Sequence, residues 1–215
     1  MSEMNIKHYG LKYFSWQKAQ GEFGGYADLF KFRDYIKKTD KVIDFGCGGG
    51  YLLKNINCRE RLGIEINGNA RSVARENGVK VVSTSDEVPN NWADVVISNH
   101  ALEHVPDPMS VLITLKEKLK SGGKTIFVVP FERGGPYKRN DINLHLFTWS
   151  PQNLGNLFKT AGYKVKSVEV INHFWPPYYW LINEYLGFRA FNFISKIYGS
   201  LNWKTTQVRI FALKK

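Results

Sequence analysis

Two acidic residues on either side of a glycine-rich segment stand out in this chain of 215 residues. Residues 42–51 read VIDFGCGGGY, in which a short apolar run predicts a buried strand and the glycines allow a tight turn. Asp44 lies in the first run, and Glu65 follows a second apolar run twenty-one residues later. We expect both strands to end at one edge of a parallel sheet, where a carboxylate can accept hydrogen bonds from a ribose diol. The pattern predicts a nucleoside-binding site.

The spacing of the glycines narrows the choice of nucleoside. A dinucleotide site needs the pattern Gly-x-Gly-x-x-Gly, whereas Tyr51 stands here in the place of the last glycine. Asp44, two residues before the first glycine, would repel a phosphate but can bind an amine. A carboxylate can lie over the N-terminus of the helix predicted for residues 51–57, and a ribose can lie on Glu65. An ammonium, a carboxylate and a ribose together describe S-adenosylmethionine.

Residues 44–50, DFGCGGG, resemble the first motif of class I S-adenosylmethionine-dependent methyltransferases. Residues 102–105, LEHV, resemble a turn of small-molecule members of that class, including those of ubiquinone synthesis. The resemblance covers about residues 40–170 and implies S-adenosyl-L-methionine as the cofactor. It departs from the family at Thr84, where an acid usually stands, so the assignment of the adenine amino contact to Asp86 stays open. The expected cofactor-binding residues are Asp44, Gly46, Cys47, Gly48, Gly50, Glu65, Ile66, Ser85, Asp86 and Asn99.

Three histidines are the candidates for catalysis. Methyl transfer from a sulfonium is an in-line displacement, in which the enzyme mainly positions the acceptor atom and excludes water. A hydroxyl acceptor also needs a base, whereas an amine with a free lone pair needs little more than positioning. Histidine titrates in the useful pH range, so the expected catalytic residues are His100, His104 and His145. For His104, holding its own turn in place by a hydrogen bond is an equally good interpretation.

The segment around His104 also matches a zinc-binding pattern. His100-x-x-Glu103-His104 has the spacing at which two histidines one helical turn apart bind zinc in a class of peptidases. Prolines at 106 and 108 leave room for little more than one turn of helix, and the sequence shows no evident third ligand. We therefore expect no metal site. A divalent ion held by Glu103 and His104 against a substrate oxygen is the lesser alternative.

The order of the expected elements predicts the fold. Strand-like apolar runs alternate with helix-like segments, which is typical of an α/β fold with a doubly wound, mostly parallel sheet of seven strands, the Rossmann-like methyltransferase fold. The family resemblance implies that the last two strands pair as an antiparallel hairpin. The glycine pair at 122–123 is expected to end a helix. The expected strands are 41–45, 61–66, 80–83, 94–98, 124–129, 163–170 and 207–214, and the expected helices are 69–77, 109–119 and 148–161.

A helical lid is expected before the first strand. Residues 9–38 are rich in aromatic and charged residues at helical spacing. In this fold such a segment would lie across the cofactor, so we expect residues 1–40 to act as a lid. Its aromatic residues either cover the site or pack against the domain; they are Tyr9, Tyr13, Trp16 and Phe23.

An aromatic insertion separates the last two strands. Residues 171–206 are far too long for a hairpin turn, and helical spacing extends over residues 179–198. Eleven of the 31 aromatic residues of the chain lie from Phe174 to Trp203. This aromatic content predicts a segment that packs against something and does not merely connect two strands. The favoured interpretation is a helical cap that packs on the domain or on a second copy in a homodimer. The alternative is contact of residues 174–203 with a membrane surface or a lipid-like acceptor.

Charge is distributed unevenly along the chain. Residues 1–115 contain 14 basic and 14 acidic residues, whereas residues 116–215 contain 16 and 5, so the net charge of +11 arises in the second part. This asymmetry favours an anionic partner, with a well-solvated surface as the simpler alternative. The expected contacts to an anionic acceptor are Arg133, Lys138 and Arg139.

Length and composition fit a single domain, with residues 1–40 as the lid, 41–130 as the cofactor-binding half and 131–215 as the acceptor-side half. The first ten residues lack the apolar region of a signal peptide, and no run of eighteen uncharged apolar residues indicates a spanning helix. Two cysteines in a chain of this size favour a reducing compartment. We therefore expect a cytoplasmic protein. Peripheral association with the inner face of the membrane is the further alternative.

The sequence predicts methyl transfer to a small or lipid-linked anionic acceptor, at oxygen rather than nitrogen. An RNA methyltransferase is the alternative, because basic residues with interleaved aromatic residues also suit single-stranded nucleic acid. The lack of a separate RNA-binding domain counts against it. A third alternative is a non-catalytic protein that keeps the cofactor-binding fold.

Overall fold

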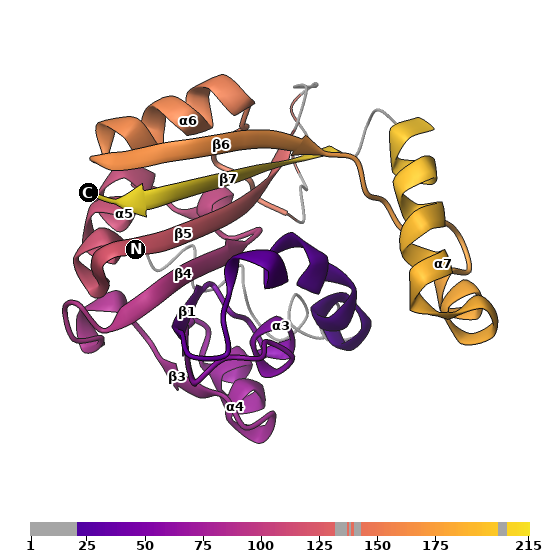
Figure 1. The fold of residues 1–215 in the computed structure, drawn as a ribbon, viewed down its shortest axis with the longest axis horizontal. Coiled ribbons are helices and arrows are strands. Elements are labelled where there is room, and N and C mark those ends of the chain that lie inside the picture. Colours follow the sequence, from indigo (N-terminus) through magenta and orange to yellow (C-terminus); the bar gives the residue numbers. More distant parts are fainter. Residues whose placement is uncertain (1–20, 132–136, 138, 140–142, 202–205) are drawn as a thin grey trace.

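A seven-stranded sheet forms the centre of the molecule (Figure 1). The structure, a computed structural model, describes residues 21–131, 137, 139, 143–201 and 206–215. In the order β3-β2-β1-β4-β5-β7-β6, strands β1 to β5 run parallel, and β7 is antiparallel to both β5 and β6. This confirms the predicted sheet and its antiparallel edge. The strands are β1 (Lys41–Phe45), β2 (Glu60–Ile64), β3 (Lys80–Val82), β4 (Ala93–Asn99), β5 (Leu119–Phe131), β6 (Tyr163–Ile171) and β7 (Thr206–Lys214).

Helices cover both faces of the sheet, because neighbouring residues of a strand point to opposite faces. Ile43 of β1 belongs to one buried cluster together with residues of α5 and α6. Val42, the residue before it, belongs to a second cluster with residues of α3 and α4. The carboxyl ends of the parallel strands are thereby fixed at a common edge between two packed layers. The α-helices are α3 (Tyr51–Lys54), α4 (Gly68–Glu76), α5 (Pro108–Lys118), α6 (Pro151–Thr160) and α7 (Tyr179–Leu201).

The glycine pair at 122–123 lies inside β5, so the prediction that it ends a helix was wrong. Helix α5 ends at Lys118, and β5 begins at the next residue. The pairing of β4 with β5 shifts register between Ala93 and Val95, so that extra residues of β5 bulge out at this point. Gly122 takes a φ of +70° within this bulge, which glycine tolerates without strain.

Helix α3 is shorter than the predicted 51–57. It spans four residues, and the side chain of Asn55 donates a hydrogen bond of 2.9 Å to the carbonyl of Tyr51. A side chain that bonds the backbone in this way competes with continued helix formation and favours a turn. The segment after the glycine turn is therefore a single helical turn.

The N-terminal segment is helical over residues 21–27 and continues as two 3-10 turns, η1 (Asp28–Lys31) and η2 (Arg33–Tyr35). The predicted lid residues Tyr9, Tyr13 and Trp16 lie outside the described residues. The ring of Phe23 packs against three aromatic rings of the insertion, those of Trp175, Tyr179 and Phe191.

Helix α7 carries the insertion and stands beside the sheet, beyond the end of β6 (Figure 1). It is kinked at Gly187, whose φ of 77° and ψ of 168° are not helical. Its second half packs closely on residues 172–174 through the small buried residues Ser195 and Gly199, and the Ser195 carbonyl accepts a hydrogen bond from the Phe174 amide. No helix within the described ranges is both long and apolar enough to cross a membrane.

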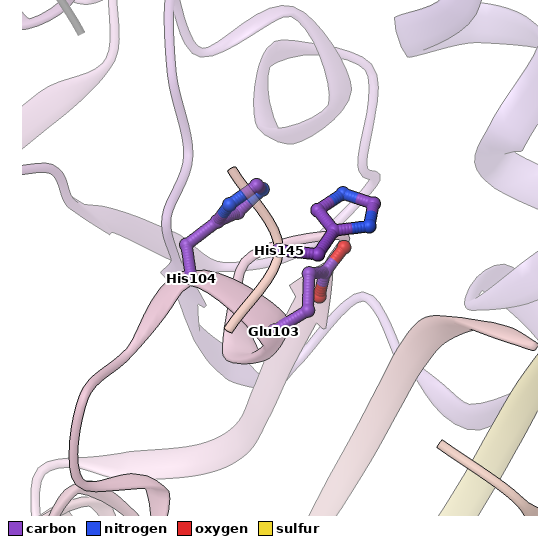
Figure 2. A group of neighbouring side chains, drawn as sticks. All are labelled: Glu103, His104 and His145. Carbon is purple, nitrogen blue, oxygen red and sulfur yellow. The ribbon is translucent and has the colours of Figure 1, made fainter. Parts of the chain in front are cut away.

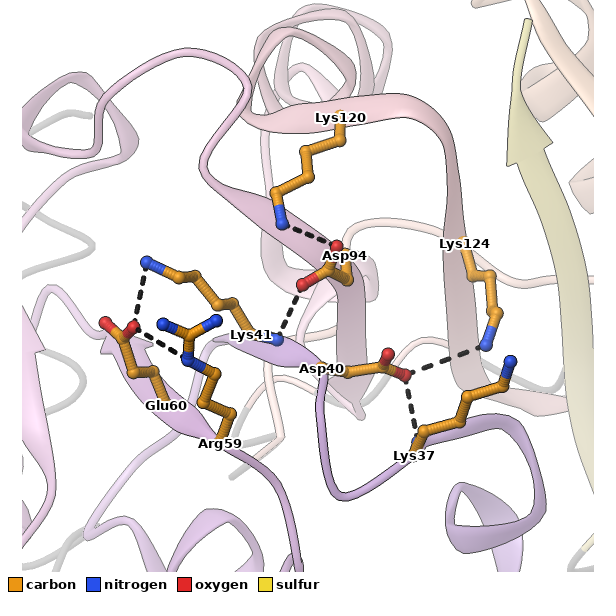
Figure 3. Close-up of polar contacts among 8 residues, drawn as sticks. All are labelled: Lys37, Asp40, Lys41, Arg59, Glu60, Asp94, Lys120 and Lys124. Carbon is orange, nitrogen blue, oxygen red and sulfur yellow. Dashed lines mark hydrogen bonds and ion pairs between the residues drawn. The ribbon is translucent and has the colours of Figure 1, made fainter.

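Ion pairs hold the amino ends of the strands (Figure 3). Asp94 accepts a hydrogen bond of 2.8 Å from the backbone amide of Lys41 and pairs with Lys120 at 2.6 Å. Asp40 likewise lies 3.7 Å from the ammonium of Lys124. Each of these carboxylates has a cationic partner, so this edge of the sheet needs no ligand.

Candidate active site

The carboxyl ends of β1 and β4 open into a cavity of about 580 Å³. Asp44 and the glycine turn line it from β1, and the segment after β4 contributes His100 and η4 (Leu102–His104). Gly21, Gly24 and Gly25 of the N-terminal segment also line it, which is the position expected of a lid. The cavity therefore gathers groups from both halves of the chain.

The glycine turn after β1 owes its shape to backbone conformations that favour glycine. Gly46 and Gly48 have φ values of +74° and +52°. A Cβ atom on Gly46 would collide with the side chain of Ala101. The turn can therefore run close to the segment after β4, and its amide groups remain beside the cavity.

A second cavity of about 310 Å³ adjoins the first. Gly46, Gly48, His100 and His104 line both cavities, so the two are continuous. The second is lined further by the end of β2 and by the segment after β3, at residues 83–85. Its polar and apolar walls suit the adenosine part of a nucleoside ligand.

Glu65 is held in the wall of the second cavity by two backbone hydrogen bonds. Its Oε2 atom accepts a hydrogen bond of 2.9 Å from the Gly48 amide, and its Oε1 atom accepts one of 2.8 Å from the Asn67 amide. Burial raises the pKa of Glu65, while the two amide hydrogen bonds oppose that shift. Each oxygen keeps a free lone pair, so the carboxylate can still accept hydrogen bonds from two hydroxyl groups.

Asp44 has the opposite environment from the acids at the amino edge of the sheet. Its side chain is buried, and burial followed by the nearby charge of Glu65 raises the pKa of its carboxyl group well above the usual range. Within the described part of the chain, no hydrogen bond and no cation contributes a lowering of this pKa. An ammonium group in the first cavity would relieve both effects, because it supplies the missing positive charge. The site thus fits the amino-acid part of S-adenosylmethionine.

Most of the expected cofactor-binding residues line these cavities. Gly46, Cys47, Gly48 and Asn99 join Asp44 in the first cavity, and Glu65, Ile66 and Ser85 line the second. Two do not: Gly50 is buried against Val79 as the N-cap of α3, and Asp86 is exposed in η3 (Ser85–Glu87). Contacts of all ten with the cofactor remain a prediction.

The three candidate histidines all line the first cavity, around the buried carboxylate of Glu103. Nδ1 of His100 lies 3.4 Å from Glu103 Oε1, and the rings of His104 and His145 are 4.9 Å apart (Figure 2). Burial lowers the pKa of His104, and the charge of Glu103 opposes that shift. Burial acts to raise the pKa of Glu103, but the charges and hydrogen bonding of the neighbouring histidines lower it overall.

A buried ion pair beside the cavity escaped the sequence analysis. Lys31 lies 2.9 Å from Asp28, and Asn99 donates a hydrogen bond of 2.9 Å to the same carboxylate. Burial acts to raise the pKa of Asp28, and the charge of Lys31 lowers it overall. Asp28 and Lys31 stand on η1, far from Asn99 in sequence, so no local pattern joins the three.

Of the three basic residues expected to contact an anionic acceptor, Arg139 is exposed. Arg133 and Lys138 lie outside the described residues. Lys31, which the sequence did not single out, is instead the cation placed in the wall of a third cavity, of about 680 Å³. That cavity is lined mainly by aromatic residues at the start of the insertion, from Phe174 to Trp180.

Known proteins share this architecture. Residues 19–168 match a family model described as a methyltransferase domain. The ubiquinone biosynthesis O-methyltransferase of Proteus mirabilis (strain HI4320) is 33% identical over 134 residues, which is 52% of this chain and 54% of that protein. The ubiquinone biosynthesis O-methyltransferase of Nitrosococcus oceani is 32% identical over 133 residues, or 52% of this chain and 55% of that protein. The chain thus spans about half the length of the curated relatives it matches.

Solved structures agree in fold. A S-adenosylmethionine-dependent methyltransferase from Thermotoga maritima has a TM-score of 0.68 at 17% identity, over 98% of both chains. At such low identity the likeness shows the fold alone. The family match, in contrast, extends over more than half of the sequence. The chain therefore belongs to the methyltransferase-domain family and is an S-adenosyl-L-methionine-dependent methyltransferase.

Proposed function

We propose that this methyltransferase methylates a hydroxyl oxygen of a small or lipid-linked anionic acceptor. The observation that carries the proposal is a shared cavity: the buried carboxylate of Asp44 and the cluster of His100, Glu103, His104 and His145 line the same space. The group proposed to bind the ammonium and the groups proposed to act on an oxygen therefore line one cavity. Methyl transfer needs this closeness of cofactor and acceptor.

The cofactor would be held by chain segments whose chemistry matches its parts. Asp44 would pair with the ammonium, and Glu65 would accept hydrogen bonds from the ribose hydroxyls, as in other nucleoside sites at strand ends. The adenine would lie in the second cavity between Ile66 and Ser85. When bound, S-adenosyl-L-methionine supplies a methyl group on a positively charged sulfur. The N-terminal glycines 21, 24 and 25 would then exclude water from the first cavity.

The acceptor would enter through the third cavity. Asp28, His100, Phe174 and Trp175 line both the first and the third cavity, so the two are joined beside the histidine cluster. Aromatic walls suit a ring or a lipid chain, and the excess of basic residues after residue 115 suits an anionic group. The acceptor oxygen would lie against His104 and His145. These residues, with His100, are the proposed catalytic residues.

One comparison and one structural feature support oxygen as the methylated atom. The curated relatives are named as O-methyltransferases, although they match over about half of their length. An amine acceptor would need mainly positioning, whereas the cluster of three histidines around a carboxylate offers groups that can remove or hold a proton. The cluster is therefore better suited to a hydroxyl acceptor.

The test is transfer of a labelled methyl group to matched pairs of acceptors. Purified protein is incubated with methyl-labelled S-adenosylmethionine and a panel of phenols, each paired with the corresponding aniline, with and without an acyl or prenyl chain. We expect label on phenols that carry a chain, and loss of transfer in Glu65→Ala because cofactor binding is lost. Preferential labelling of the anilines, or label on no small molecule, would contradict the proposal.

An RNA substrate is the second candidate, favoured by exposed basic residues such as Lys164 and Lys166 on the edge strand β6. It predicts RNA binding that weakens steeply with salt, because released counterions drive such binding.

A further inference from the structure

Glu103 has an environment that the proposed methyl transfer leaves unexplained. Its side chain has no exposed area, and neither carboxylate oxygen accepts a hydrogen bond of good geometry from the residues that the structure describes. Nδ1 of His100 approaches Oε1 at 3.4 Å, which is long for a hydrogen bond. Burying a carboxylate in this way is unfavourable, because the water it has lost is not replaced. Only the long contact with His100 and the nearby histidine rings replace that water, and a bound cation would replace it more fully.

Two imidazole rings stand beside this carboxylate. Ring nitrogens of His104 and His145 and a carboxylate oxygen of Glu103 lie within 4.8 Å of one another (Figure 2). The three come from two separate segments, η4 and the loop before α6. A hydrogen bond of 2.9 Å from the Leu146 amide to the Glu103 carbonyl holds the segments together. The ligand atoms are thus gathered by the backbone and not only by side-chain rotation.

The His104 ring is oriented in the way that metal-binding histidines usually are. The carbonyl of Leu144 accepts a hydrogen bond from this ring. A histidine that donates one ring N–H to a backbone carbonyl presents its other nitrogen as a lone pair, which is the form that binds metals. Such a contact with Leu144 would favour the tautomer that binds a metal.

We propose that Glu103, His104 and His145 bind a divalent transition-metal ion at the wall of the acceptor cavity. Two imidazole nitrogens and one carboxylate suit Zn²⁺, Fe²⁺ or Co²⁺ better than Mg²⁺ or Ca²⁺, which prefer oxygen ligands. Bonds of about 2.0–2.2 Å require the ligand atoms to move somewhat closer together, by small side-chain rotations. Asp44 and the glycine turn line the same cavity, so the ion would stand beside the cofactor site.

The role of the ion rests on the proposed function. Three protein ligands leave coordination positions open for the acceptor hydroxyl, and a bound ion lowers the pKa of that hydroxyl. Its proton would leave to water, the oxygen would form a bond to the methyl carbon, and the carbon–sulfur bond would break with its electron pair going to sulfur. In this arrangement His104 and His145 act as metal ligands and the ion takes the place of a general base.

Direct metal binding is the first test. Protein stripped with a chelator is titrated with Co²⁺, whose visible absorption responds to nitrogen and oxygen ligands, and Zn²⁺ is then added in competition. We expect one ion per chain, with binding weakened on the order of tenfold or more in Glu103→Gln and His145→Ala. Glu117→Gln, the same change at an exposed acid of α5, should bind as the wild type does. Equal Co²⁺ affinity in the wild type and Glu103→Gln would overturn the proposal.

Thermal unfolding separates a metal ligand from a structural acid. Without metal, the unfolding midpoints of the wild type and of Glu103→Gln are measured first, as the reference for each protein. Added Zn²⁺ should raise the midpoint of the wild type and leave that of Glu103→Gln in place. A lower midpoint of Glu103→Gln without metal, together with an unchanged response to Zn²⁺, would assign Glu103 to packing and reject the site.

Failure of the site and failure of the proposed function give different results. If the ion binds through Glu103 but no phenol is methylated, the metal site stands and the proposed function falls. If phenols are methylated equally well in the presence of chelator and by Glu103→Gln, the proposed function stands and the metal site falls. Binding of S-adenosylmethionine, measured by calorimetry, should be retained in Glu103→Gln in either case.

Discussion

Carboxylates at the two edges of the sheet show how position decides the role of a residue. Asp94, at the amino edge, has a backbone donor and a lysine partner, whereas Asp44, at the carboxyl edge, is buried with neither. The first environment stabilises the fold. The second is unfavourable until a cation arrives, which is expected where a fold keeps a binding site ready for a ligand.

Asparagine substitutions at these two positions should have opposite effects. Asp44→Asn should leave the free energy of unfolding unchanged or raise it, and should weaken S-adenosylmethionine binding by about 10- to 100-fold, the value of a charge-assisted hydrogen bond. Asp94→Asn should lower the free energy of unfolding by about 1 kcal/mol and leave cofactor affinity unchanged. Calorimetric titration and urea unfolding of both variants check this pair. Equal loss of affinity in the two would show that Asp44 acts through the fold and not on the ammonium.

His173 should make the stability of the protein depend on pH. Burial lowers its pKa to about 4, and its Nε2 atom lies 3.1 Å from Oδ1 of Asn192. The charged groups that influence it are Lys31 and Asp28 of η1 and Lys196 of α7. In the unfolded chain its pKa is about 6.5, so between pH 6.5 and 4 the unfolded state binds a proton that the folded state does not. Lowering the pH through this window therefore destabilises the fold, by at most about 3 kcal/mol.

Urea unfolding of the wild type and of His173→Gln at pH 7.5 and pH 5.0 measures this effect. The wild type should lose about 2 kcal/mol more than the variant between the two pH values, because glutamine does not titrate. Carboxylates change in both proteins and cancel in the comparison. The same pH dependence in both proteins would mean that His173 is protonated in the folded state.

The sequence allowed the chemically informative residues to be predicted, but not all of their surroundings. Asp44 and Glu65 were found because each follows a recognisable apolar run and lies near glycines. Gly50 and Asp86, predicted from the motif, prove to lie outside the two cavities. Asp28 and Lys31 could not be predicted as a pair with Asn99, because that contact joins residues 68 and 71 positions apart.

At the level of elements, η1 is tied to the end of β4 by the hydrogen bonds that its buried ion pair makes with Asn99. The Lys31 side chain is 1% exposed, and Asp28 and Asn99 are its partners. Removing one member of such a pair leaves an uncompensated charge in the interior. The segment that carries η1 thus depends on this contact for its place beside the cavity.

Breaking the Asp28–Lys31 pair should destabilise the protein more than removing it altogether. Asp28→Asn alone should lower the free energy of unfolding by about 3 kcal/mol, and Asp28→Asn with Lys31→Met should recover much of that loss. The exposed pair of Arg33 and Asp34 is the control, and Asp34→Asn should change stability by about 0.5 kcal/mol or less. Urea unfolding of the wild type and these three variants tests this, and a double variant no more stable than Asp28→Asn would contradict it.

Element boundaries were predicted best where local patterning decides them. β1 spans residues 41–45 as predicted, because an apolar run bounded by a turn needs no distant partner to be recognised. The glycine pair at 122–123 was misjudged because the bulge that absorbs it is set by pairing with β4. α7 was expected over 179–198 and extends to Leu201. The helical spacing of the sequence did not indicate its kink at Gly187.

At the scale of the whole molecule, α7 stands beside the sheet (Figure 1) and carries large exposed apolar side chains. Tyr185, Phe193 and Leu201 are 76%, 66% and 76% exposed. Exposed Arg189 and Lys196 stand on the same helix. Large exposed apolar side chains among basic residues suit the surface of an anionic membrane, which is the alternative interpretation of the insertion. Under the favoured interpretation of the insertion, a second copy of the chain would cover the same side chains.

Vesicle binding and oligomeric state distinguish these two partners. If the surface meets lipid, the protein should sediment with phosphatidylglycerol vesicles more than with phosphatidylcholine vesicles, and less at high salt, because attraction between charges is screened. Tyr185→Ser with Phe193→Ser should weaken binding more than tenfold, since each aromatic side chain contributes roughly 1.5–3 kcal/mol on burial. Ile113→Ser, an equally apolar exposed site on α5, should bind as the wild type does. A dimer in light scattering that the same double substitution dissociates, without vesicle binding, would show instead that α7 packs against a second copy, and the acceptor would then reach the third cavity from solution.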